Sequence, residues 1–216
     1  MARRFDIVWQ GEPVKEALGD EHHEPSQSVS NDEVVLPAIQ RDFIWEEEKA
    51  EKLFDSIMRK YPIGIALLWE TYEDIQYRSF IRDFKAGQPH AYRDNTQRRR
   101  LKLVLDGQQR LQALYIGLFG SREGKRLFFD VLSGDSSDDV AEERFLFYFL
   151  TPEEAQEWNE AADEEARRME GDPSSPSWVI RVGDLFAMTA REKKDLVKRL
   201  ETDLQLTADS RVFVST

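Results

Sequence analysis

The stretch LKLVLDGQQRLQALYIGLFG, residues 101–120, contains a complete strand–turn–helix joint. Its first five residues form a short apolar run interrupted by one lysine, which predicts a strand. Apolar residues then recur at helical spacing from Leu111 to Leu118, which predicts a helix that ends at Gly120. A strand that passes through a short polar turn into a helix is typical of α/β and α+β proteins.

Three more helices are predicted outside this joint. Residues 46–62, EEEKAEKLFDSIMRKYP, have apolar residues at helical spacing, acids in the first turn, Arg59 and Lys60 in the last turn and a proline as the stop. Thr151, which precedes a proline, predicts the start of a second helix. The capping box formed by Thr189 and Glu192 predicts the start of a third.

Strands alternate with these helices along the chain. They are predicted in VVLP at 34–37, in IGIALLW at 63–69, at 126–132, at 144–150 and within 178–186, where a turn follows the strand. Residues 77–87 are predicted to be a short helix or an insertion. Because the loops are long and irregular, we predict a mixed α/β (α+β) fold with a small mixed sheet flanked by helices. We expect an N-terminal segment and linker at 1–33, a core at 34–150 and a partly helical extension at 151–216 that is cut from a longer protein.

The composition limits the function classes. The chain has 40% hydrophobic residues and no cysteine, which excludes disulfides and cysteine nucleophiles. Its apolar runs are all shorter than the roughly 18–20 residues of a membrane helix, so we expect a cytoplasmic protein with no membrane partner. His22 and His23 are adjacent in a polar stretch, and His90 is far from them, so we expect no histidine metal site.

The turn from Asp106 to Arg110 has two interpretations. Asp106 is a favoured N-cap residue, and Gln109 three positions later could complete a capping box after the turn at Gly107. Arg110, however, lies in the first helical turn, where the helix dipole favours anions by about 0.3–1 kcal/mol per charge. No acidic residue follows Asp106 until Glu123, so the helix itself does not offset this positive charge. Backbone N–H groups, two glutamine amides and a guanidinium together suit a phosphate, although Arg110 could also pair with a nearby carboxylate.

A second glutamine–arginine pair, Gln40-Arg41, also follows a predicted strand and precedes a predicted helix. Ligands of open α/β sheets bind beyond strand ends, so the two pairs could meet in one crevice with Asp106 as a ligand for Mg²⁺. Arg41 could instead pair with a neighbouring acid. Asp55 and Ser56 flank the apolar face of the helix in 46–62, and the pattern alone favours ordinary positions on its surface.

One basic segment, RDNTQRRRLK at 93–102, precedes the joint. The net charge of the chain is −12, which makes it a poor general DNA binder, so any DNA surface must be local. The basic residues of the segment 93–102 are Arg93, Arg98, Arg99, Arg100 and Lys102. The segment is either a DNA contact or a solvated loop.

Two longer stretches carry a resemblance to a known family. LPAIQRDFIWEEEKAEKLFDSIMRKYPIGIALLWE at 36–70 and LVLDGQQRLQAL at 103–114 resemble the N-terminal domain of GmrSD-type modification-dependent restriction enzymes and SspE-like phage-defence proteins. The resemblance implies a ParB/sulfiredoxin-like fold whose Asp-Gly-Gln-Gln-Arg motif binds and hydrolyses nucleoside triphosphates. The residues that match the family's site are Gln40, Arg41, Asp55, Ser56, Asp106, Gly107, Gln108, Gln109 and Arg110.

The resemblance leads to our principal hypothesis, a Mg²⁺-dependent nucleotide-hydrolysing regulatory domain of a bacterial restriction system. Arg41 and Arg110 would hold the phosphates, Asp106 would position Mg²⁺ or the attacking water, and Gln108 or Gln109 would orient that water. The chain has no cysteine for sulfiredoxin-like chemistry and too few histidines for a His-Asn-His nuclease, so we expect a C-terminal or separate nuclease partner. The alternatives are a DNA-nicking nuclease and a nucleotide or modified-DNA sensor without turnover.

Overall fold

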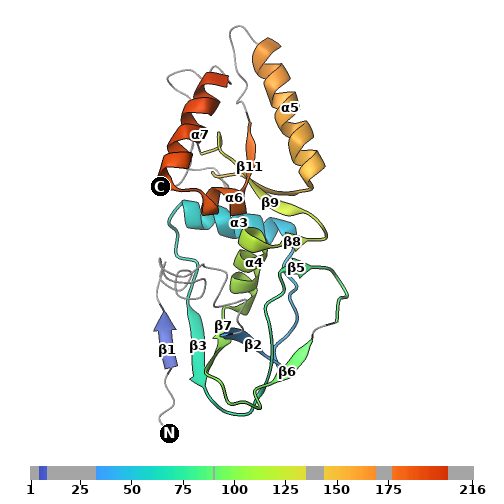
Figure 1. The fold of residues 1–216 in the computed structure, drawn as a ribbon, viewed down its shortest axis with the longest axis vertical. Helices are drawn as coiled ribbons and strands as arrows, with labels where there is room; N and C mark the ends of the chain where they lie inside the picture. The colour runs from blue at the N-terminus through green and yellow to red at the C-terminus, as the bar shows by residue number, and fades with distance from the viewer. Residues whose placement is uncertain (1–4, 9–32, 90, 135–143, 169–176, 204–216) are drawn as a thin grey trace. The chain divides into compact units, whose positions relative to one another are not determined.

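The computed structural model describes residues 5–8, 33–89, 91–134, 144–168 and 177–203. These residues form a mixed α/β chain that divides into two compact units (Figure 1). Unit 1 consists of Met1–Glu46 and Pro62–Gly120, and unit 2 of Glu47–Tyr61 and Ser121–Thr216. The chain therefore leaves unit 1 after Glu46, contributes one helix to unit 2, returns at Pro62, and leaves unit 1 again after Gly120.

Unit 1 is built on a six-stranded mixed sheet. Its order is β1 (Phe5–Val8), β3 (Ala66–Thr71), β7 (Leu101–Asp106), β2 (Val34–Pro37), β4 (Gln76–Arg78) and β6 (Tyr92–Asp94). Only β2 and β7 pair in parallel, and Val35 lies opposite Leu103; the other neighbours are antiparallel. Figure 1 shows β3, β7 and β2 side by side. The predicted mixed sheet is confirmed, and Pro37 ends its strand as expected.

Unit 1 buries side chains both on its sheet and on helix α4 (Gln108–Phe119). Val35, Tyr77, Leu101 and Leu103 form a fully buried cluster on the sheet. Helix α4 is buried around almost its whole circumference, including two glutamines that would ordinarily face water. Buried amides must be hydrogen-bonded, so the glutamines of α4 indicate where this helix is tied to the rest of the unit.

Unit 2 contains a three-stranded antiparallel sheet in the order β10 (Phe147–Leu150), β9 (Arg126–Asp130) and β11 (Val179–Arg181). Helix α3 (Glu47–Met58) packs against β10, where the Phe54 and Phe147 rings lie 5.5 Å apart. The remaining elements with described positions are β5 (Asp83–Phe84) in unit 1 and β8 (Ser121–Arg122), α5 (Pro152–Arg168), α6 (Val182–Ala187) and α7 (Ala190–Asp203) in unit 2.

Most predicted helices are confirmed, with their caps. The Thr151 N–H donates to Glu154 at 2.7 Å and the Glu154 N–H donates back to the Thr151 hydroxyl at 3.2 Å, and Thr189 and Glu192 form the same reciprocal pair. Helix α3 has the predicted apolar face but ends at Met58, so Arg59 and Lys60 follow it rather than forming its last turn.

Two local predictions differ from the structure. Of the two alternatives for residues 77–87, the helix is wrong, because Tyr77 and Arg78 are buried within the sheet and β5 follows; the insertion stays a prediction. The strand predicted at 63–69 begins only at Ala66, since Gly64 has a φ of 91° that does not fit a strand. His22, His23, His90 and the end of the predicted extension, residues 204–216, lie outside the described residues. No helix in the described ranges is long and apolar enough to span a membrane.

Candidate functional site

The joint between β7 and α4 places a glycine at the helix start. β7 ends at Asp106, Gly107 follows with a φ of 86°, and α4 begins at Gln108 without a side-chain cap. A Cβ on Gly107 would lie 3.2 Å from both an Arg110 nitrogen and the Ile65 carbonyl oxygen, so glycine is needed here for conformation and for space. The predicted capping box is therefore wrong, because Gly107 occupies the N-cap position.

The start of α4 remains electrostatically positive. Its first turn contains no acidic residue, and the first bond within the helix runs from the Leu111 N–H to the Gly107 carbonyl at 3.0 Å. The N–H groups of the three preceding residues have no partner inside the helix. Asp106 is exposed directly before them. An anion supplied from outside would complement this end of the helix.

Gln108 and Gln109 reach across to the segment that follows β2. The Gln109 amide accepts from the Ile44 N–H at 3.0 Å and donates to the Asp42 carbonyl at 2.8 Å, so it pairs with this segment as a strand neighbour would. The Gln108 amide donates to the Arg41 carbonyl at 3.4 Å. The two glutamine–arginine motifs of the sequence are thus brought together, as predicted.

Arg78 on β4 fixes the same segment from the other side. Its guanidinium donates to the Gln40 carbonyl at 3.0 Å, to the Arg41 carbonyl at 2.5 Å and to the Asp42 carboxylate at 2.7 Å, although the side chain is only 2% exposed. The Gln40 amide donates in turn to the carbonyl of Leu105 at 2.8 Å at the end of β7. The main chain at 40–42 is therefore fixed, while the Arg41 side chain is exposed.

Arg110 binds main chain rather than a carboxylate. Its guanidinium donates to the carbonyl of Ile63 and, at 2.5 Å, to the carbonyl of Ile65. A Cβ on Gly64 would overlap an Arg110 nitrogen, which explains the glycine between these two carbonyls. Two of the three guanidinium nitrogens are thereby engaged, which assigns Arg110 chiefly to shaping the turn before β3.

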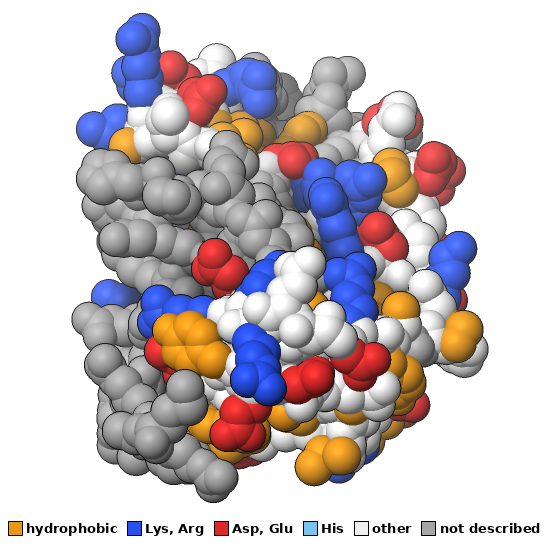
Figure 2. Space-filling model, turned by 60° about the horizontal axis from the view of Figure 1, so that its bottom comes forward, with side chains coloured by type: hydrophobic (Ala, Val, Ile, Leu, Met, Phe, Trp, Pro, Cys, Tyr) orange, Lys and Arg blue, Asp and Glu red, His pale blue; other side chains and the backbone are white. Residues whose placement is uncertain are grey.

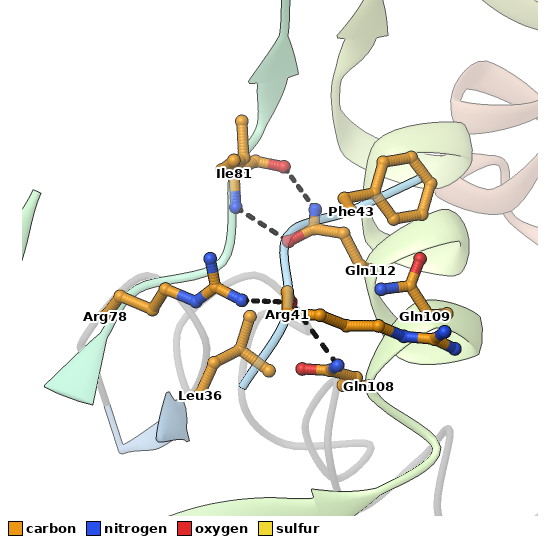
Figure 3. Close-up of a pocket in the computed structure, with 8 residues that line it drawn as sticks. All are labelled: Leu36, Arg41, Phe43, Arg78, Ile81, Gln108, Gln109 and Gln112. Atoms are coloured by element: carbon orange, nitrogen blue, oxygen red, sulfur yellow. Dashed lines mark hydrogen bonds between the residues drawn. The ribbon is translucent and has the colours of Figure 1, made fainter. Parts of the chain in front are cut away.

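Gln112, one turn further along α4, repeats the pairing seen at Gln109. Its amide accepts from the Ile81 N–H at 3.0 Å and donates to the Ile81 carbonyl at 2.6 Å (Figure 3). Sequence reasoning missed both Gln112 and Arg78, because neither belongs to a motif and their partners are 31 to 38 residues distant. Their only signal in the sequence is a polar residue at a position where the pattern requires an apolar one.

Arg41, Arg78, Gln108, Gln109 and Gln112 line a small open hollow in unit 1 that has room for about one water molecule. Figure 3 shows Gln108 bonded to Arg41 and Gln112 bonded to Ile81, with Arg78 reaching Arg41 from the opposite side. Two buried polar atoms there, Arg78 Nε and the Gln108 carbonyl oxygen, have no hydrogen-bond partner within the described residues. Both atoms are buried from solvent, where polar groups are ordinarily hydrogen-bonded.

Asp55 and Ser56, which the family resemblance suggested as site residues, lie on α3 of unit 2. The buried Asp55 carboxylate accepts from the Phe145 N–H at 2.8 Å and the Arg144 N–H at 3.2 Å, and pairs with Arg59 at 3.4 Å. The Ser56 hydroxyl donates to the Lys52 carbonyl of its own helix at 2.8 Å. Both side chains have structural contacts inside unit 2, and their role toward a nucleotide stays a prediction.

The basic segment begins in β6 and ends in β7, and its residues from Thr96 to Arg100 are exposed. The buried Asn95 organises its turn by donating to the Arg99 carbonyl at 2.8 Å, while the Arg99 guanidinium donates to the Tyr77 hydroxyl at 3.1 Å. Arg100 pairs with Glu70 at 2.6 Å, and this hydrogen bond raises the pKa of Arg100. Figure 2 shows lysine and arginine side chains lying among acidic ones on the visible face, so positive charge is not concentrated in one continuous area there.

Comparison with known proteins identifies the family. The uncharacterized protein MJ0686 of Methanocaldococcus jannaschii is 33% identical over 87 residues, which are 40% of this chain and only 15% of that protein. Residues 24–207 match the family described as the N-terminal domain of GmrSD restriction endonuclease. This match covers most of the chain, and it confirms the family that residues 36–70 and 103–114 indicated. The chain therefore belongs to the family of GmrSD restriction endonuclease N-terminal domains.

Proposed function

We propose that this chain is a nucleotide-binding and nucleotide-hydrolysing regulatory domain of a bacterial restriction or anti-phage protein that acts in the cytoplasm. The observation that carries the proposal is the uncapped start of α4 after Gly107, with the exposed Asp106 beside it. We further propose that unit 1 has the ParB/sulfiredoxin-like arrangement that the family resemblance implies.

The triphosphate would bind at the start of α4. The N–H groups of the first helical turn supply donors, and the dipole of a 12-residue helix favours a negative charge there. The Arg41 side chain is exposed while its main chain is fixed by Arg78 and Gln108, so its guanidinium can reach a phosphate from a rigid base. Arg110 and Gln109 would act as positioning residues, because their polar atoms already hold main chain.

Asp106 is the residue we propose for Mg²⁺. Its exposed carboxylate fits an ion held mainly by phosphate oxygens and water, since such sites need only one or two protein carboxylates. When bound, Mg²⁺ would neutralise charge on the phosphate oxygens. Asp106 and Gln108 would orient the attacking water, and Arg41 would hold the phosphate group in place. Catalysis of this kind depends on positioning and charge neutralisation rather than on a covalent intermediate.

The partners remain proposals as well. A nuclease domain, in the same protein or in a separate one, would be the controlled element. DNA would be contacted by the exposed arginines of the basic segment, Arg93, Arg98, Arg99 and Arg100, together with Lys102. A nuclease site in this chain itself is less favoured, because no group of three or more acidic, His or Cys side chains could hold a metal in the described residues.

Phosphate release from ATP, GTP, CTP and UTP with Mg²⁺ tests the proposal. We would compare the unmodified chain with Asp106→Ala and Arg41→Ala, and use Arg98→Ala as a control that removes another exposed arginine. We expect turnover of at least one nucleotide, its loss in the first two variants and its retention in the control. Nicking of a plasmid without nucleotide would favour the nuclease alternative, whereas tight binding without phosphate release would favour a sensor.

A further inference from the structure

The chain passes between the two units three times, after Glu46, after Tyr61 and after Gly120, and the start of α4 holds the connections on either side of α3. The chain leaves unit 1 after Glu46, forms α3, and returns at Pro62. The outgoing connection consists of residues 41–46 and the returning connection of residues 62–65. Neither connection is a helix or a strand, so its backbone groups must be satisfied by side chains or by water.

The outgoing connection is held by the two glutamines of the motif. The Gln109 amide bonds the carbonyl of Asp42 and the N–H of Ile44, and the Gln108 amide donates to the carbonyl before them. Gln109 is 7% exposed. Its bidentate pairing leaves this part of the connection little freedom to move without breaking both bonds.

The returning connection is held by the next residue of the motif. The Arg110 guanidinium donates to the carbonyls of Ile63 and Ile65, and Gly64 between them permits this close approach. Three consecutive residues on the first turn of one helix therefore hold both ends of the excursion that contains α3. This turn is also where we propose that the nucleotide binds.

We infer that the Gln108-Gln109-Arg110 turn couples nucleotide binding in unit 1 to unit 2 through these two connections. This inference rests on the proposed function, and it adds how nucleotide binding in unit 1 would regulate unit 2. Phosphate bound to the N–H groups of this turn fixes the positions of the three side chains, and both connections become more rigid together. Release of the nucleotide loosens both, and α3 is the element of unit 2 that is joined directly to them.

Hydrogen exchange measured by mass spectrometry on the full chain tests this inference. ATP, GTP, CTP and UTP, each with Mg²⁺, are first titrated by calorimetry, and exchange is then compared without nucleotide and at about ten times its Kd. We expect exchange in residues 42–46, 62–65 and the first turn of α3 to slow by a factor of about two to ten, which corresponds to the net free energy of one hydrogen bond.

Two variants separate coupling from general stability. Gln109→Ala removes the pairing with the outgoing connection, and Gln109→Glu keeps the acceptor for Ile44 while losing the donor to Asp42. Gln112→Ala is the matched control, because it removes the same bidentate pairing from the same helix but releases Ile81, which lies in neither connection. We expect both Gln109 variants to lose the protection of α3 at saturating nucleotide, and the Gln112 variant to keep it.

The outcomes distinguish this inference from the proposed function. Protection of the α4 start without any change in the two connections would overturn the coupling and leave nucleotide binding intact. Equal loss of α3 protection in the Gln109 and Gln112 variants would also overturn the coupling, because it would indicate general destabilisation. Calorimetry that detects no binding of any nucleotide would overturn both.

Discussion

Replacement of Arg78 by methionine should destabilise unit 1 although no sequence motif contains this residue. Its guanidinium supplies donors to the carbonyls of Gln40 and Arg41, and each carbonyl left without a partner costs about 1–3 kcal/mol. The Arg41 carbonyl would keep its weaker bond from Gln108 at 3.4 Å. The ion pair with Asp42 adds little, because that carboxylate is 67% exposed. We therefore expect a loss of about 2–4 kcal/mol in the free energy of unfolding.

Urea unfolding followed by far-ultraviolet circular dichroism measures this loss. With a slope of about 2 kcal/mol per molar urea, the midpoint should fall by about 1–2 M. If the two units unfold separately, the shift should occur in the transition of unit 1. Arg98→Met, the same substitution at an exposed position, should change stability by less than about 0.5 kcal/mol. An Arg78→Met protein within 0.5 kcal/mol of the unmodified chain would refute the reasoning.

Three further predictions concern other parts of the fold. Gly64→Ala should lower the stability of unit 1 by about 2–3 kcal/mol in the same assay, because backbone strain at a φ of 91° is added to a clash with the Arg110 guanidinium. Gly87→Ala, with a φ of 73° and no atom nearby, should cost only the strain of about 1–2 kcal/mol. Equal losses of stability in the two variants would contradict the contribution of the clash. Asp55→Ala should destabilise unit 2 by about 2–4 kcal/mol, whereas Ser56→Ala should be almost neutral, and a neutral Asp55→Ala would show that the two N–H bonds contribute nothing. Hydrogen bonds from Thr189 lower the pKa of Glu192. The cap of α7 should therefore stabilise the helix fully above the usual pKa of a glutamate, and this stabilisation should be lost as the pH falls through the lowered pKa. Hydrogen exchange in α7 should follow this pH dependence, and Glu192→Gln should abolish the dependence.

Local features of the fold could be predicted from the sequence because their causes are local. The strand–turn–helix joint, the apolar face of α3 and the two capping boxes depend on residues within a few positions of one another. The segment at 77–87 was misread because the burial of Arg78 in the sheet depends on carbonyls 37 and 38 residues away. A charged residue whose partners are distant in the sequence is predicted to lie on the surface when only the residues adjacent to it in the sequence are considered.

The candidate site was predicted in part for the same reason. Gly107 and the meeting of the two glutamine–arginine pairs follow from turn chemistry and from strand ends that share one edge of a sheet. The partners of Arg110 could not be predicted, because a guanidinium binds carbonyls as readily as phosphate and the sequence does not show which is in reach. Asp55 likewise gave no sign that its partners lie 89 and 90 residues away.

Calorimetric titration of ATP, GTP, CTP and UTP with Mg²⁺ into the unmodified chain, Arg41→Ala and Arg98→Ala tests the central claim most directly. We predict that at least one nucleotide binds to the unmodified chain. Arg41→Ala should weaken the binding of that nucleotide by about tenfold or more, as expected for a charge-assisted contact of about 1.5–3 kcal/mol. Arg98→Ala should leave the affinity unchanged. Equal affinity in all three proteins, or no binding of any nucleotide to the unmodified chain, would contradict a phosphate site at the start of α4.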